Sequence, residues 1–236
     1  MGCDIHLFVE KRNADTGKWE AVKGVNEPEI EGIRRVIEGC KKRGAFDSVD
    51  YWESRLAELQ NGTTDYIWEG RHYLLFEVLA GVRAKHDLMP VSDPKALPDD
   101  MSSEVRDSAE YWNGDGHNHS WLTIAELNAY NWDQVISREG WVNVPQFKEF
   151  QEKGSPSGWC GGVGGGGVRH VTNREMKEGI ENGFLFGDPR DYYTLVQWKE
   201  PLREALGTWC EWSLSKLNEL AGDDLESARI VFWFDN

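Results

Sequence analysis

Two short segments carry side chains of the types that hold metal ions. The first ten residues, MGCDIHLFVE, alternate as a β-strand does, which puts Asp4 and His6 on one face, two residues apart. The segment NGDGHNHSW is expected to be a glycine-flanked loop that presents Asp115, His117 and His119. Imidazole and carboxylate ligands together suit Zn²⁺, Mn²⁺ or Fe²⁺. The spacing therefore predicts a divalent metal ion held by Asp4, His6, His117 and His119; the alternative is two unrelated features, with His6 a core histidine.

An open position on such an ion could activate water or polarise a phosphoryl oxygen, and the chemistry would then need a base. Asp115 is one candidate for this catalytic role. Glu77 is the other, because it interrupts the most apolar helical stretch of the chain, RHYLLFEVLAGVR at 71–83. The alternative for Glu77 is that it points outward or pairs with Arg71 or Arg83.

A glycine-rich loop at 154–168 and nearby aromatic residues are candidates for holding a substrate. Gly164 and Gly165 lie in the run GGVGGGG, whose composition favours a lid or a linker, with a phosphate cradle formed by successive backbone N–H groups as the alternative. Trp121 and Trp159 could stack on a base, and Arg169 follows the loop directly. A thiol nucleophile at Cys160 with His170 as its base is a weaker alternative.

The elements that must position these residues indicate an α+β fold in a single domain spanning 1–236. A hairpin is expected over 3–23, and the closing apolar strand 228–234 is expected beside the first strand in a mixed or antiparallel sheet. Helical patterns cover 29–43 and 48–59, which together form a predicted helical-hairpin insertion at 29–62. Further expected elements are helices at 71–83, 123–132, 145–153, 173–182 and 201–222, and strands at 135–144 and 191–198.

The composition limits the classes of partner. The 236-residue chain has a formal net charge of −15 and a pI near 4.8, so its field repels duplex nucleic acid. Two classes of acidic protein remain: one whose site recruits cations to hold a small anionic substrate, and one whose surface mimics nucleic acid and binds the basic groove of another protein. The four cysteines form no C-x-x-C pair, no signal peptide is visible, and no apolar run reaches the about 20 residues of a membrane span. We therefore expect a cytoplasmic protein with no membrane segment.

Four sequence boxes resemble those of a family of uncharacterised tailed-phage and prophage proteins. They are MGCDIH at 1–6, YLLFEVLAGVR at 73–83, HSWL at 119–122 and RIVFWFDN at 229–236. The resemblance runs from one end of the chain to the other, and it implies a phage or prophage origin and hence the cytoplasm of a bacterial host. It implies no particular activity.

Two function hypotheses follow. The first is a metal-dependent hydrolase acting on a small phosphorylated or nucleotide substrate, in which the loop 158–167 closes over the substrate. The second is a non-catalytic phage counter-defence protein, either a nucleotide sponge or an acidic decoy that binds a host defence protein.

Overall fold

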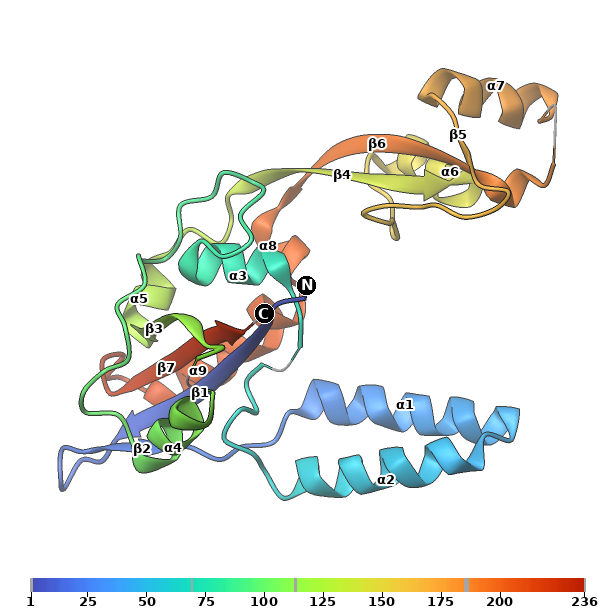
Figure 1. Ribbon diagram of the computed structural model, residues 1–236. Coiled ribbons are helices and arrows are strands. Elements are labelled where there is room, and N and C mark those ends of the chain that lie inside the picture. Colours follow the sequence, from blue (N-terminus) through green and yellow to red (C-terminus); the bar gives the residue numbers. More distant parts are fainter. Residues whose placement is uncertain (1, 69, 113, 185–186, 236) are drawn as a thin grey trace. The chain divides into compact units, whose positions relative to one another are not determined.

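A computed structural model describes residues 2–68, 70–112, 114–184 and 187–235, and its contacts divide the chain into two compact units (Figure 1). Unit 1 comprises Met1–Asn131 and Leu206–Asn236, and unit 2 comprises Trp132–Ala205. Both units combine helices with a β-sheet, which confirms the predicted α+β class. The assignment of the whole chain to one domain stays a prediction.

The sheet of unit 1 has the order β2-β1-β7-β3, with antiparallel neighbours throughout. Its strands are β1 (Asp4–Arg12), β2 (Trp19–Ala21), β3 (His117–Thr123) and β7 (Ala228–Asp235). The predicted pairing of the first and last strands is confirmed. Strand β7 is apolar along almost its whole length and lies between β1 and β3, so its residues are buried on both faces of the sheet.

The expected loop at 117–119 is wrong, because these residues begin β3. The apolar β7 has a second edge that needs a hydrogen-bonding partner, and β3 supplies it. The pairing shifts register between His117 and Ser120, and Asn118 takes a φ of +50° within this bulge. A strand with a bulge does not show the simple alternation by which strands are recognised in sequence.

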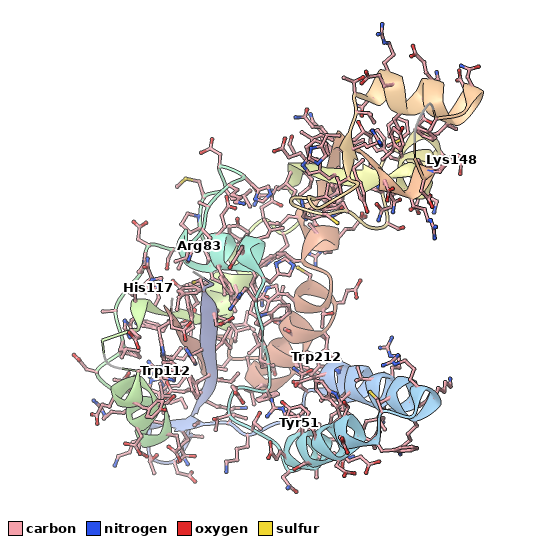
Figure 2. All side chains as sticks on the ribbon, turned by 45° about the vertical axis from the view of Figure 1, so that its right-hand side comes forward. Tyr51, Arg83, Trp112, His117, Lys148 and Trp212 are labelled. Atoms are coloured by element: carbon pink, nitrogen blue, oxygen red, sulfur yellow. The ribbon has the colours of Figure 1, made fainter. Side chains whose placement is uncertain are left out.

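Seven helical segments of unit 1 cover this sheet or pack beside it. They are α1 (Glu27–Arg43), α2 (Phe46–Gln60), α3 (Tyr73–Ala80), α4 (Ser103–Tyr111), α5 (Ile124–Ala129), the π-helical η2 (Trp209–Ser213) and α9 (Leu214–Ala221). Helices α1 and α2 form an antiparallel hairpin around their own apolar cluster, while Tyr51 of α2 is exposed (Figure 2). Helix α4 packs Val105 and Ala109 onto β1 and β7. Among the residues that the structure describes, no helix is both long enough and apolar enough to cross a membrane.

Unit 2 is built on a long antiparallel pair, β4 (Val135–Asn143) with β6 (Tyr192–Pro201), and the short β5 (Arg169–His170) lies parallel to β6. Its helical segments are α6 (Val144–Lys153), α7 (Asn173–Asn182), η1 (Pro189–Asp191) and α8 (Leu202–Leu206), whose last residue is assigned to unit 1. Capping boxes start α6 and α7, as the sequence predicts for α7. The glycine-rich segment 154–168 contains no helix or strand; it is held by the bridge between Cys160 and Trp141, by hydrogen bonds of Ser157 to Glu149, and by the contact of His170 Nε2 with the Val163 carbonyl.

The single long helix expected at 201–222 is wrong. The chain forms α8, η2 and α9 instead, and Gly207, with a φ of +45°, separates the first from the second. Apolar spacing continues through all three segments, so the hydrophobic pattern alone does not show the break.

Candidate functional site

The predicted metal ligands on β1 are held by neighbouring side chains. Arg71 donates two hydrogen bonds to the Asp4 carboxylate, from Nε at 2.9 Å and from Nη2 at 2.7 Å. These bonds hold the pKa of Asp4 below its ordinary value, despite slight burial that acts the other way. The Nε2 of His6 lies 3.2 Å from Oδ2 of Asp235, which joins β1 to β7. Asp4 and His6 therefore each take part in a pair of their own.

The two histidines of β3 contact different β7 side chains. The ring of His119 stacks on Trp233 with the centroids 5.9 Å apart, whereas His117 (Figure 2) packs against Phe234 at 6.0 Å. Successive residues of a strand point to opposite faces, so these contacts put the two histidines on opposite faces of the sheet. Burial, together with the charge of His117, lowers the pKa of His119.

The rings of His6 and His119 contact the same Trp233. Asp115 lies exposed in the turn before β3. Within the described ranges no group of three or more His, Cys, Asp or Glu side chains is arranged to hold a metal ion. The divalent metal site, with Zn²⁺, Mn²⁺ or Fe²⁺ as its ion, stays a prediction that the observed pairing does not support.

Glu77 does not point outward, so that alternative is wrong, and the partners that the structure describes for it are backbone N–H groups and His86. Its side chain is 1% exposed and accepts hydrogen bonds from the backbone N–H groups of Lys85, His86 and Leu88 at 3.0, 2.8 and 3.3 Å. The Nδ1 of His86 lies 2.8 Å from the same carboxylate. Glu77 thus anchors the chain that follows α3, and this role accounts for its burial.

The substrate-binding residues expected around the glycine-rich loop lie in unit 2, apart from Trp121. Trp159 is 40% exposed and packs on Gly140, and the guanidinium of Arg138 lies over its ring. Nothing lies within 4 Å of the position of a Cβ on Gly164 or Gly165. Arg169 is exposed, and its guanidinium carbon lies 5.8 Å from the Tyr192 ring centroid. The loop has space around it for a ligand, but no described side chain encloses that space.

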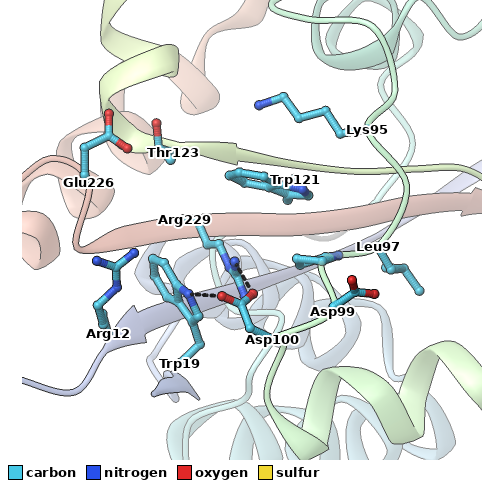
Figure 3. Close-up of a pocket in the computed structure, with 11 residues that line it drawn as sticks. Arg12, Trp19, Lys95, Leu97, Asp99, Asp100, Trp121, Thr123, Glu226 and Arg229 are labelled. Atoms are coloured by element: carbon cyan, nitrogen blue, oxygen red, sulfur yellow. Dashed lines mark hydrogen bonds and ion pairs between the residues drawn. The ribbon is translucent and has the colours of Figure 1, made fainter. Parts of the chain in front are cut away.

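A pocket of about 520 Å³ lies in unit 1 and contains one of the predicted residues, Trp121 (Figure 3). Strands β1, β2, β3 and β7 and the loop before α4 form its walls. The walls combine aromatic rings, cations and carboxylates: Arg12, Trp19, Lys95, Leu97, Pro98, Asp99, Asp100, Trp121, Thr123, Glu226 and Arg229.

Arg229 is the buried charge of this pocket, with only 2% of its side chain exposed. Its Nε donates to Oε2 of Glu10 at 2.8 Å, and its Nη1 lies 2.9 Å from Oδ1 of Asp100. Its Nη2 is buried and has no hydrogen-bond partner among the residues described. An unsatisfied buried donor costs free energy, about 1–3 kcal/mol or more for a charged group. A ligand oxygen that reaches Nη2 once a covering side chain moves aside would remove that cost.

The cations and tryptophans of the pocket alternate. Figure 3 shows Arg12 on one side of Trp19 and Arg229 on the other, with Trp121 beyond Arg229 and Lys95 beyond Trp121. The Arg12 and Arg229 guanidinium carbons lie 4.8 and 4.0 Å from the Trp19 ring centroid. Arg229 lies 5.5 Å and the Lys95 ammonium 4.3 Å from the Trp121 centroid. This stack holds the Arg229 guanidinium rigidly, as a preformed binding group requires.

Local sequence explains how the pocket forms. Glu10 of β1 and Thr123 of β3 both lie opposite Arg229 of β7, so pairing of the three strands brings the buried ion pair together. The loop is held to the sheet because Trp19 donates through Nε1 to Asp100 at 3.0 Å and the backbone N–H of Ser102 donates to Glu10 at 2.6 Å.

Sequence reasoning found Trp121 and missed the residues around it. One signal was available: in two strands expected side by side, Glu10 follows the apolar run of the first and Arg229 precedes the apolar run of the second, which are matched positions if the strands pair antiparallel. Opposite charges at matched positions of paired strands indicate a buried ion pair. The contributions of Lys95 and Asp100 have no such signal, because loop geometry brings them in.

No family model, no curated protein and no solved structure matches this chain.

Proposed function

We propose that the protein binds a small phosphorylated or nucleotide ligand in the Arg229 pocket and releases it unchanged. The observation that carries the proposal is the buried Nη2 of Arg229, a preformed cationic donor without a partner among the described residues, in the wall of a pocket. Arginine donors suit phosphate oxygens because the N–H groups are fixed in a plane and stay charged. The pocket volume of about 520 Å³ lies within the usual range for small-molecule sites.

Arg12 supports the same proposal from the pocket mouth. Its side chain is exposed, and it has no carboxylate partner among the residues described. An arginine in this state can move onto a bound anion without first giving up an ion pair. The pocket therefore offers one fixed donor from β7 and one adaptable donor from β1.

The resemblance to phage and prophage proteins suggests the setting for this binding. A protein that sequesters a nucleotide signal of the host without destroying it acts as a sponge, which is the counter-defence role we propose. The metal-dependent hydrolase remains the competing prediction, and no described arrangement of Asp4, His6, His117 and His119 favours it.

Isothermal titration calorimetry with adenosine mononucleotides tests the proposal. We expect binding by the native protein and a loss of about 10- to 150-fold in affinity in Arg12→Gln, because one charge-assisted hydrogen bond is worth roughly 1.5–3 kcal/mol. Arg35→Gln, which alters an exposed arginine on α1 outside the pocket, is the matched control and should bind normally. Equal affinity in Arg12→Gln and in the native protein would overturn the assignment of the site.

Recovery of the ligand separates binder from enzyme. After denaturation of the complex, the binder returns the nucleotide intact, and EDTA changes neither affinity nor melting temperature. Turnover that depends on added Zn²⁺, Mn²⁺ or Fe²⁺ and disappears in Asp4→Asn and His6→Ala would establish the hydrolase instead.

A further inference from the structure

The charges around the Arg229 pocket set a limit on the charge of its ligand. Three cations line the pocket, Arg12, Lys95 and Arg229, and three carboxylates line it with them, Asp99, Asp100 and Glu226. A pocket selected for a highly charged anion would have an excess of cations at its mouth. This pocket has no such excess.

Most of the positive charge is already compensated. Arg229 lies between the carboxylates of Glu10 and Asp100, and the Lys95 ammonium contacts the Glu126 carboxylate. Arg12 is therefore the pocket cation for which the described residues supply no carboxylate.

The uncompensated negative charge is larger. Asp99 and Glu226 are exposed at the pocket, and neither side chain makes a hydrogen bond or ion pair with a described residue. Glu10 adds a further charge behind Arg229. A ligand group with two or more negative charges would meet these carboxylates at close range, where like charges repel.

We infer that the ligand is a phosphodiester, which carries one negative charge at each phosphate, and not a phosphomonoester or a polyphosphate; this inference rests on the proposed function. A phosphodiester has two non-bridging oxygens. The guanidinium carbons of Arg12 and Arg229 lie 4.8 and 4.0 Å from the Trp19 ring centroid, on opposite sides of the ring, so one phosphate group accepts from both once the exposed Arg12 side chain turns around the ring edge. Nη2 of Arg229 provides one hydrogen bond and the exposed Arg12 the other, while Asp99 and Glu226 repel a second negative charge.

Calorimetry with three probes tests the inference: 3′,5′-cyclic AMP, AMP and ATP, in the same buffer without divalent ions. Cyclic AMP is a phosphodiester with a single charge, AMP carries close to two at its phosphate, and ATP carries more. We expect cyclic AMP to bind about tenfold more tightly than AMP, with ATP weaker still, because each added charge meets the pocket carboxylates.

Neutralising those carboxylates should remove the preference. In Asp99→Asn/Glu226→Gln the affinities for cyclic AMP and AMP should agree to within about twofold, because the repulsion that separates them is gone. Asp107→Asn/Glu110→Gln changes the net charge of the protein equally, on exposed positions of α4 outside the pocket, and should leave the preference intact.

The outcomes separate the inference from the proposed function. If AMP or ATP binds as tightly as cyclic AMP, or if the preference survives in Asp99→Asn/Glu226→Gln, the phosphodiester inference is wrong and the binding site stands. If none of the three probes binds, the proposed function fails with it.

Discussion

Breaking the ion pair between Glu10 and Arg229 should cost unit 1 much of its stability. Both side chains are buried, at 0% and 2% exposure, so the Glu10 carboxylate that remains in Arg229→Met has no water and, among the described residues, no cation beside it, and keeps only the hydrogen bond from the Ser102 N–H. Removing one partner of such a pair costs about 3–5 kcal/mol. Asp100, whose side chain is 65% exposed, adds less than about 1 kcal/mol. We therefore expect a loss of about 3–5 kcal/mol, or roughly 6–20 °C in melting temperature.

The double variant Glu10→Gln/Arg229→Met isolates the pair from its surroundings. The glutamine carbonyl can still accept the hydrogen bond from the Ser102 N–H, and methionine can still pack between the tryptophans, so at least half of the lost stability should return. The exposed Arg35→Met is the control and should stay within about 0.5 kcal/mol of the native protein.

The assay is urea unfolding combined with hydrogen exchange of the peptides that contain β1 and β7, which confines the measurement to the sheet of unit 1. A loss of unfolding free energy below about 1 kcal/mol in Arg229→Met would refute the reasoning. The same holds if Glu10→Gln/Arg229→Met loses as much stability as the two single variants do in sum.

Three further predictions concern other parts of the chain. Burial raises the pKa of Glu77, but hydrogen bonds from a histidine and three backbone N–H groups outweigh burial and hold this pKa below 4.5. The ionised Glu77 therefore stabilises the fold above pH 4.5, and this stability is lost as pH falls through the pKa of the folded state. In urea unfolding measured at several pH values, Glu77→Gln should reduce the loss of stability at acid pH and should cost about 1–3 kcal/mol at neutral pH. An unchanged loss of stability at acid pH would contradict this role of Glu77. Burial and a neighbouring imidazole lower the pKa of His119, so an NMR titration of its ring should have a midpoint below 6.5. The stability that the neutral ring contributes is present above pH 6.5 and is lost as pH falls. A midpoint at or above 6.5 would contradict this environment. A Cβ on Gly140 would lie 2.7 Å from the Trp159 ring, so Gly140→Ala should cost roughly 1–3 kcal/mol in thermal unfolding. The control Gly162→Ala places its Cβ in open space and should not destabilise the protein. Equal melting temperatures for the two variants would contradict the packing of Trp159 on Gly140.

Much of the fold follows from patterns that a sequence displays directly. The alternation of 3–9, the apolar run 228–234 and the capping box at Thr172 predict β1, β7 and the start of α7, because each depends on neighbours in the chain. Helix α4 was missed because only Val105 and Ala109 mark its buried face, which is too short a pattern to stand out among polar residues.

The candidate site was predictable only where local chemistry decides it. Trp121 was expected to bind a ligand because it is a large aromatic residue beside a polar segment, and it does line a pocket. The metal hypothesis assumed that a glycine-flanked loop presents His117 and His119 together, whereas both residues lie in β3. The bulge at Asn118 separates His117 from His119, and Arg71, distant in sequence, takes up the Asp4 carboxylate. Such long-range partners depend on tertiary packing, which composition and spacing do not encode locally.

The pairing of β1 with β7 also determines when the molecule can fold. The hydrogen bond from the Asp4 N–H to the Asp235 carboxylate joins positions 231 apart, so the ribosome must deliver nearly all of these residues before the first strand meets its neighbour. Until then the apolar side of β1 has no β7 to pack against, and contacts of such sequence separation form slowly. Nascent chains stalled before residue 228 should consequently associate with chaperones, while the α1–α2 hairpin, whose contacts are close in sequence, can form early.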